Sequence, residues 1–414
     1  MKRALLISTA LGVALSASQA FAGGLERGGY NIDLLFDPSD YAADASVTYV
    51  MPKRELDNVR DVNPANGVGS NGIGGGQSSG VRDTESYFVP RVGFKAGFAE
   101  AADCLVQYSQ PWGAHSNPGA DWVGANSNIE TKIDSHSADF TCSYRFAVGP
   151  GQFRIIGGGY YQEVEGFKER LVAPVPLLAP GAGTGVGRLD LEGNGWGYRV
   201  GAAYEMPEIA LRASLVYNSE VDLGDVTGTL DLRQIPGAIN PANPFLGGVT
   251  DVFGTATMPQ SVELKVQSGI APGWLAFGSV KWVDWSVLQT LPFCPTAFSA
   301  VPCTAGGPTE ATSLELLYQD GWTVSAGIGH KFSETISGAA SLTWDRGTAT
   351  TLGTQTDTWT VSGGLSYTPS EMVELRFGGA LGVLTSGSSI DEDVAYDFGN
   401  DFVGAIQAGA RIRF

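Results

Sequence analysis

The sequence has few charged residues and few residues of the kinds that usually carry catalysis or bind metals. Only 16% of its 414 residues are charged and only 3 are histidine, whereas a soluble domain is usually about 25% charged. After the N-terminus it lacks any run of about 20 apolar residues, which excludes a helical membrane protein. The net charge of −18 disfavours nucleic-acid binding, which needs basic patches. Aromatic residues make up 10%, too many for a disordered chain. A large β protein remains.

The first residues resemble a secretory signal. Lys2 and Arg3 are followed by an apolar stretch over residues 4–15 and by an Ala-Phe-Ala cleavage pattern at residues 20–22. The sequence therefore predicts a signal peptide over residues 1–22 and a mature chain that starts at Gly23.

The four cysteines fit the oxidising compartment that export implies. Cys294 and Cys303 lie in a proline-rich loop and are expected to close it. Cys104 and Cys142 lie in neighbouring expected strands and are positioned to pair across them. Because no histidine lies near either pair and no C-x-x-C spacing occurs, we expect disulfides and no metal site.

Apolar and polar residues alternate with a period of two through nearly all of the mature sequence, which predicts β-strands. The expected strands cover residues 41–51, 86–98, 102–110, 130–146, 152–165, 189–206, 208–230, 252–270, 274–290, 313–332, 335–346, 356–368, 372–384 and 401–414.

The length of these strands favours a membrane barrel over a soluble β-sandwich. Sandwich strands average about five or six residues, whereas barrel strands need about 9–11 and carry aromatic girdles at both interfaces. Short and long connections alternate, as in outer-membrane barrels. We therefore predict an antiparallel barrel of about 14 strands over residues 41–414, in the outer membrane of a Gram-negative bacterium. Tryptophans expected in the girdles are Trp274, Trp282, Trp285, Trp322, Trp344 and Trp359.

Several segments resemble the FadL/TodX-type family of outer-membrane transporters for long-chain fatty acids and aromatic hydrocarbons. They are residues 258–262 (MPQSV), 281–286 (KWVDWS), 318–327 (YQDGWTVSAG), 110–113 (QPWG) and 121–124 (DWVG). The resemblance implies a 14-stranded barrel that is a monomer. By resemblance to many outer-membrane barrels, the C-terminal Phe414 is the signal that the barrel-assembly machinery reads.

The start of the mature chain departs from the family pattern. The family usually has an N-terminal hatch that ends in Asn-Pro-Ala, but here only residues 23–40 precede the first strand, and we expect a short plug remnant. The resemblance also implies an inward kink of the third strand that opens the wall. Pro111 and Gly113 suit such a kink, because proline removes a hydrogen-bond donor and glycine tolerates unusual dihedrals. Alternatively, Pro111 only ends the strand.

Candidate ligand-binding residues are cations on the inward face and aromatic side chains in outer loops. A carboxylate in a partly dry pocket needs a cationic partner, because an unpaired buried charge is costly. Alternatively, these cations pair with lumen acids such as Glu263 and Glu374. The candidate cations are Arg91, Lys95, Arg199, Arg212, Lys265, Lys281 and Arg376. The candidate aromatic residues are Trp112, Trp122 and Phe293.

These observations favour passive uptake of hydrophobic small molecules, captured at the outer loops and released sideways near the third strand. No cofactor is expected. The partners expected are a hydrophobic ligand and the lipid and lipopolysaccharide of the outer membrane. A diffusion channel for polar solutes is the alternative if the short N-terminus leaves the lumen open. An enzyme is disfavoured, because the sequence offers no clustered nucleophile, base and orienting group.

Overall fold

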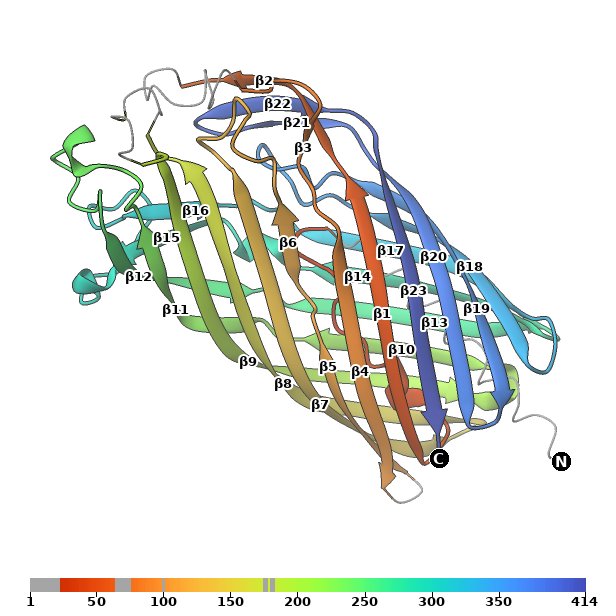
Figure 1. Cartoon of the computed structure of the whole chain (residues 1–414). Helices are drawn as coiled ribbons and strands as arrows, with labels where there is room; N and C mark the ends of the chain where they lie inside the picture. Colours follow the sequence, from red (N-terminus) through yellow and green to blue (C-terminus); the bar gives the residue numbers. More distant parts are fainter. Residues whose placement is uncertain (1–22, 64–75, 99–100, 174–177, 179–182) are drawn as a thin grey trace.

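The chain folds into one closed β-barrel (Figure 1). The computed structural model describes residues 23–63, 76–98, 101–173, 178 and 183–414; the expected signal peptide lies outside these ranges. Within them, 14 antiparallel wall strands close on themselves, because β1 pairs with both β4 and β23. The wall strands are β1 (Tyr41–Lys53), β4 (Tyr87–Phe98), β5 with β6 (Ala102–Ser109, Gly113–Ser116), β7 (Glu130–Val148), β8 (Gly151–Leu171), β9 (Val186–Met206), β10 with β11 (Leu211–Asn218, Val221–Asp231), β12 with β13 (Val249–Met258, Ser261–Ala271), β14 (Trp274–Val283), β17 (Gly321–Lys331), β18 (Ile336–Asp345), β19 (Thr358–Ser370), β20 (Val373–Leu384) and β23 (Asp401–Arg413).

The expected fold class is thus confirmed, but some expected strands are wrong in extent. The strand expected over 274–290 ends at Val283, because the chain turns into the short helix η6 (Trp285–Val287). The chain then forms β15 (Thr290–Pro295), which pairs with β16 (Thr312–Glu315) and not with β14. The strand expected over 252–270 breaks at Pro259, which has no N–H to donate.

The period of two places apolar side chains against lipid and polar ones in the lumen, as a membrane barrel requires. Side chains such as Phe88, Phe140 and Leu381 are exposed on the outer surface, whereas Thr360 and Ser362 are buried inside. Trp282 stands opposite Trp322 in the β14–β17 ladder, as a girdle requires. The girdle expectation is wrong for Trp285, which is fully buried inside the barrel on η6. Within the described ranges, none of the helices is long and apolar enough to cross a bilayer.

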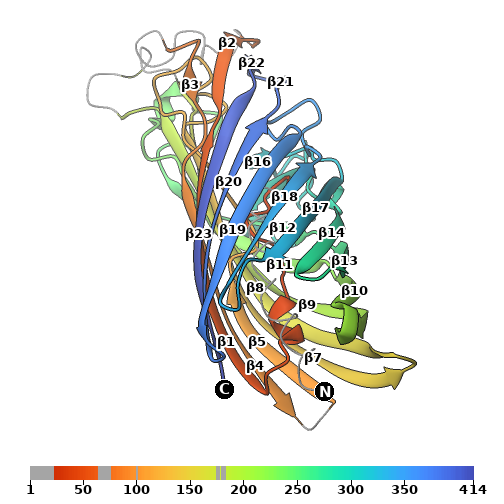
Figure 2. The same cartoon turned by 90° about the vertical axis from the view of Figure 1, so that its right-hand side faces the viewer.

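A small sheet covers the outer end of the barrel. It orders β21 (Gly387–Ile390), β22 (Val394–Phe398), β2 (Glu55–Asp61) and β3 (Val81–Arg82), and it lies beyond the wall strands in both views (Figure 1 and Figure 2). Arg54, at the base of this sheet, donates hydrogen bonds to Asp401 Oδ2 (3.0 Å) and to the carbonyls of Thr385 and Gly399. This one guanidinium therefore joins the first outer loop to the last.

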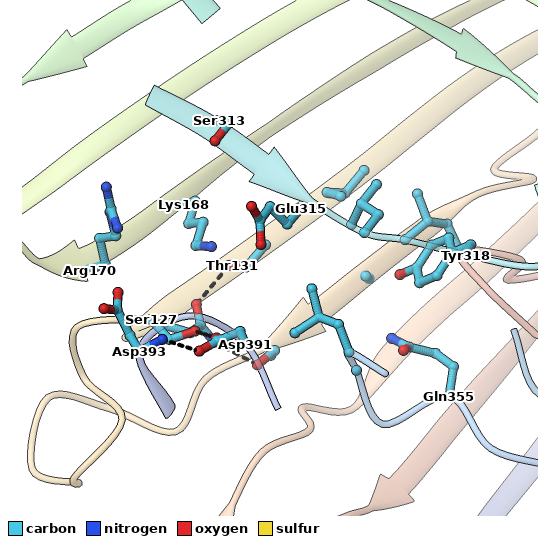
Figure 3. A pocket seen from close by; sticks show the side chains of 18 of the residues that line it. Ser127, Thr131, Lys168, Arg170, Ser313, Glu315, Tyr318, Gln355, Asp391 and Asp393 are labelled. Atoms are coloured by element: carbon cyan, nitrogen blue, oxygen red, sulfur yellow. Dashed lines mark hydrogen bonds between the residues drawn. The ribbon is translucent and has the colours of Figure 1, made fainter. Parts of the chain in front are cut away.

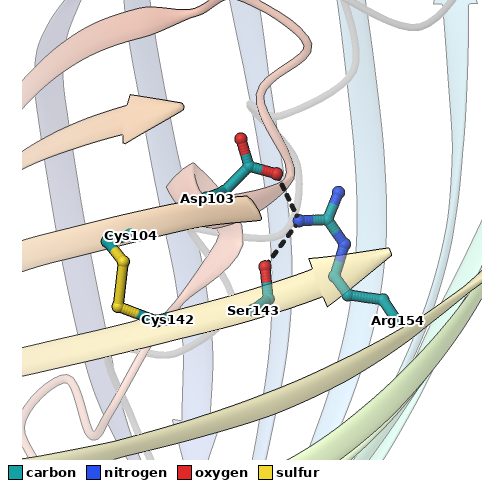
Figure 4. The surroundings of a disulfide bond; sticks show 5 residues. All are labelled: Asp103, Cys104, Cys142, Ser143 and Arg154. Carbon is teal, nitrogen blue, oxygen red and sulfur yellow. Dashed lines mark hydrogen bonds and ion pairs between the residues drawn. A yellow bond between two sulfur atoms is a disulfide. The ribbon is translucent and has the colours of Figure 1, made fainter. Parts of the chain in front are cut away.

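Residues 23–40, called here the N-terminal segment, lie inside the barrel. Their short helix η1 (Asp33–Phe36) lies at the end of the barrel that carries the short turns, where Arg154 of β8 holds it. Arg154 Nη1 donates to Asp103 Oδ2 and Ser143 Oγ, both at 2.8 Å, and to the Leu35 carbonyl at 3.3 Å (Figure 4).

Both expected disulfides are present. Cys104 and Cys142 stand opposite each other in β5 and β7, close to the Arg154 cluster (Figure 4). Cys294 and Cys303 close the outer loop that follows β15. Within the part of the chain that the structure describes, no cysteine is free.

Candidate ligand pocket and wall opening

An apolar cavity of about 80 Å³ lies toward the outer end of the barrel. The outer ends of β8, β9, β11 and β12 form one side, and the chain from Leu288 to Leu316 forms the other. Its floor includes Leu25 of the N-terminal segment. Side chains that line it are Val164, Leu191, Leu223, Val226, Ala256, Met258, Leu291, Phe293 and Leu314. Because nearly all of the lining is apolar, the cavity suits a hydrocarbon chain.

A polar cavity of about 330 Å³ adjoins the apolar one and shares Leu25, Ile133 and Lys168 with it. Figure 3 shows Lys168 among Ser313, Glu315 and Asp391, and no hydrogen bond joins Lys168 to the other residues drawn. Burial and repulsion from Arg170 together lower the pKa of Lys168 to about 8, against the attraction of Asp391 and Glu315. A cationic amine thus stands where the apolar cavity meets the polar one.

Carboxyl groups surround Lys168, and the pKa of Glu315 among them is shifted. Burial raises the pKa of Glu315, and Glu392 and Asp391 raise it further by repulsion. Asp391 Oδ2 accepts a hydrogen bond from Ser127 Oγ at 2.5 Å. Since no hydrogen bond joins Lys168 to the other residues drawn in Figure 3, its amine can donate to an anionic group that enters the cavity.

The third wall strand is interrupted, and within the described ranges its ladder to β4 is missing beside the interruption. β4 pairs with β5 only as far as Arg91 opposite Ser109, and β6 pairs with β7. Higher up, a single bridge joins Thr84 to Ser116. Between these two points, residues 87–90 of β4 face residues 110–113 without a ladder hydrogen bond in the described chain; this stretch is called the wall opening. Figure 1 shows the break between the β5 and β6 ribbons.

The N-terminal segment supplies the hydrogen bonds that β4 does not. The Pro111 carbonyl accepts from the backbone N–H groups of Arg27, Gly28 and Gly29 at 2.9–3.3 Å. The Gly113 N–H donates to the Leu25 carbonyl at 2.7 Å. Pro111 and Gly113 therefore lie at the break between β5 and β6, and their role in a lateral opening stays a prediction.

A third cavity of about 180 Å³, the inner cavity, lies behind the wall opening. Tyr87 and Gly113 line it on the side of the opening. It shares Ala114, Ser116 and Gln355 with the polar cavity. The polar cavity thus adjoins both the apolar cavity and the inner cavity.

The predicted lumen cations point inward, but most of them already have partners. Lys265 pairs with Asp33 (3.2 Å) and Glu263 (3.5 Å), and Lys281 pairs with Glu26. The other pairings are Lys95 with Asp103, Arg376 with Asp44, Arg212 with Asp33, Arg91 with the Gly28 and Gly29 carbonyls, and Arg199 with Asn218 and Thr141. This arrangement matches the alternative in which these cations stabilise the interior. Ligand binding by them stays a prediction.

Of the three predicted aromatic residues, only Phe293 lines the apolar cavity. The placement of Trp112 and Trp122 as exposed collectors of ligand is wrong. Trp112 is fully buried at the strand break, against Tyr30 and Trp285. Trp122 is buried in a separate apolar cluster beneath the outer sheet. Both side chains are covered because large aromatic surfaces at loop junctions gain most from burial.

Sequence reasoning missed Lys168, Arg27 and Leu25. The strand expected over 152–165 ends before Lys168, whereas β8 continues to Leu171. Continuing the alternation past Glu165 was the signal that would have placed Lys168 on the inner face. Leu25 and Arg27 belong to a segment without strand periodicity, so the orientation of their side chains could not be predicted.

Comparisons with known proteins agree with this architecture. A family model described as outer membrane protein transport protein (OMPP1/FadL/TodX) matches residues 8–412. The long-chain fatty acid transport protein of Salmonella typhi is 28% identical over 221 residues, 50% of this chain and 50% of that protein. Its counterpart from Escherichia coli (strain K12) is 24% identical over 231 residues, 50% of this chain and 51% of that protein. Measured by these alignments, the chain spans about half the length of the curated relatives it matches.

Solved structures show the same fold. A Pseudomonas aeruginosa FadL homologue superposes with a TM-score of 0.76 at 14% identity, over 98% of this chain and 99% of that one. The Pseudomonas putida toluene transporter TodX gives a TM-score of 0.59 at 15% identity, over 95% and 97%. These structures confirm the fold, and the family model over residues 8–412 confirms the resemblance drawn from the sequence motifs. It places the chain among outer-membrane transporters and not among enzymes. Because the family model matches nearly the whole chain, the protein belongs to the OMPP1/FadL/TodX family of outer membrane transport proteins.

Proposed function

We propose that this protein carries hydrophobic small molecules passively across the outer membrane, and that its preferred ligand is a long-chain fatty acid or a similar amphiphile. The observation that supports this most directly is the apolar cavity that ends at the Lys168 amine. A hydrocarbon chain gains free energy by leaving water for such a cavity. A carboxylate at its end gains a charge-assisted hydrogen bond from Lys168.

The N-terminal segment acts as a plug in this proposal. Its acidic residues pair with cations on separate wall strands: Glu26 with Lys281, Asp33 with Lys265, and Asp37 with Arg411. These pairs hold the segment across the lumen. Beneath the cavities, the lumen is lined by polar side chains that are hydrogen-bonded or ion-paired with one another. Such an interior disfavours the alternative of an open diffusion channel for polar solutes.

The ligand leaves sideways, through the wall opening. A hydrocarbon chain gains no free energy by entering the polar lumen. The inner cavity, in contrast, ends at Tyr87 and Gly113, beside the lipid-facing surface. Movement of residues 25–29 away from Pro111 would open this route without disturbing any wall ladder, because β4 and β6 are not paired with each other.

The other expected partners fit this proposal. The outward side chains of the wall face lipid, and the Phe414 side chain is exposed at the end of β23, where the assembly machinery could read it. We propose that the barrel functions as a monomer, as the family resemblance implies.

Filling the apolar cavity tests the proposal. Ala256 lines the cavity, and its neighbour Thr255 is exposed on the opposite face of β12. We expect Ala256→Phe to abolish binding of oleate by the purified protein and to abolish oleate uptake by cells that lack other fatty-acid transporters. Thr255→Phe adds the same bulk outside the cavity and should leave both unchanged. Normal oleate binding and uptake by Ala256→Phe would refute the proposal.

A further inference from the structure

Arg27 lies in the wall opening itself. Its side chain is 4% exposed, and its Cζ lies 4.4 Å from the centroid of the Tyr87 ring on β4. It passes directly over Gly113, where an added Cβ would lie 2.6 Å from the Arg27 Cζ and Nε atoms. The guanidinium thus occupies the space between the two unpaired edges of the wall.

Only one edge of this guanidinium has a protein partner. Nη1 donates to Asp134 Oδ1 of β7 at 2.7 Å. Nε and Nη2 are buried and have no hydrogen-bond partner among the described residues. Asp134 in turn has a second cation, because Lys132 Nζ lies 2.7 Å from its Oδ2. Asp134 would therefore keep a partner if Arg27 moved.

The two free donors are the pair that binds carboxylates. Nε and Nη2 point along the same edge of the planar guanidinium, and this edge matches the two oxygens of a carboxylate. Leaving buried donors without an acceptor costs free energy, so an arriving acceptor is favoured. A neutral headgroup satisfies at most one of these donors without charge assistance.

We propose that Arg27 is a carboxylate-binding site in the wall opening, and that it makes the lateral exit selective for anionic amphiphiles over neutral compounds of the same chain length. This inference rests on the lateral exit proposed above. A ligand carboxylate that reaches the inner cavity binds the free edge of Arg27. Asp134 holds the guanidinium through Nη1, so the ligand bound at the free edge pulls against this bond and draws the guanidinium out of the opening. No covalent step is involved.

The test compares uptake of oleate with uptake of oleyl alcohol, which has the same chain and no charge. In Arg27→Gln we expect the ratio of oleate to alcohol uptake to fall about tenfold, in line with the loss of a charge-assisted hydrogen bond. Oleate binding at the outer cavities of the purified protein should be unchanged. Arg233→Gln, which removes an exposed cation paired with Asp231 in an outer connection, is the matched control and should keep the wild-type ratio.

A second variant keeps the test decisive if Arg27→Gln does not reach the membrane. Asp134→Asn frees Arg27 from its partner while the carboxylate-binding edge remains, so the preference for oleate should rise. An unchanged ratio in Arg27→Gln or in Asp134→Asn, or an equal loss of oleate and alcohol uptake in Arg27→Gln, would refute the selective role of Arg27. Failure of the proposed function itself looks different, because wild-type protein would then take up neither compound.

Discussion

Tyr30 Oη donates a hydrogen bond to Gln162 Oε1 at 2.7 Å in the interior of the barrel. The two residues lie 132 positions apart, one on the N-terminal segment and one on β8. The Tyr30 ring also packs against Trp112 and Tyr160, with centroids 5.6 Å and 4.6 Å away. A segment without strand structure is therefore fixed across the lumen by both polar and aromatic contacts.

Because this segment fills the lumen, we expect the purified protein to give no steady ion current in planar bilayers. Deletion of residues 24–35 removes Tyr30 and the pairs formed by Glu26 and Asp33, and should produce steady channels. Deletion of residues 304–306 in an exposed outer loop is the control, and this variant should give no steady ion current. Large steady currents through the wild-type protein would instead favour the diffusion channel.

Lys168 should set the affinity for anionic ligands at the outer cavities. Lys168→Gln is expected to weaken oleate binding about tenfold, because a hydrogen bond to a charged group contributes roughly 1.5–3 kcal/mol. Binding of oleyl alcohol should hardly change. A fluorescent fatty-acid displacement titration measures both, and equal weakening of the two ligands would show that Lys168 acts only through packing.

The same lysine predicts a dependence on pH. Burial lowers its pKa from the ordinary value to about 8, so the amine is cationic below that pH and neutral above it. The ligand carboxylate stays ionised over the whole range. Oleate affinity should therefore decline as the pH rises through about 8, and Lys168→Gln should show no such decline. A flat wild-type profile between pH 7 and pH 9 would contradict this assignment.

Arg54 should stabilise the outer cap. Its side chain is 1% exposed and pairs with Asp401. Its removal leaves this carboxylate and three loop carbonyls without the Arg54 donor. Arg54→Met is expected to lower the free energy of unfolding by about 3 kcal/mol. Arg82→Met provides the comparison, because Arg82 is 63% exposed in its pair with Glu85 and should cost less than about 1 kcal/mol. Urea unfolding followed by tryptophan fluorescence measures both, and equal costs would contradict the account.

The wall of the barrel could be predicted from the sequence, whereas the ligand pocket could not. Alternation of side chains reports which face each strand residue occupies, so the inward placement of Lys265 and Lys281 follows directly from it. The same pattern carries no information about partners. Lys281 is neutralised by Glu26, which lies 255 positions away in a segment that has no period.

The ligand pocket could not be predicted because the alternation of side chains also carries no information about the path of the connections. Its lining comes from the outer ends of strands and from connections such as residues 288–316, where local turns and disulfide closure decide the path of the chain. Trp285 illustrates this, since its apolar side chain fits a membrane girdle equally well until η6 turns it inward against Trp112.

The central claim is that ligand leaves through the wall opening after residues 25–29 move. A disulfide between these residues and β4 tests it, because a Cβ added at Gly28 would lie 2.9 Å from Val89 Cγ1. In the double variant Gly28→Cys with Val89→Cys, oleate uptake should stop when the new disulfide forms and return on mild reduction, while oleate binding persists throughout. Wild-type protein under the same reducing conditions controls for its own disulfides. Uptake at the wild-type rate with the disulfide verified as formed would contradict the lateral exit.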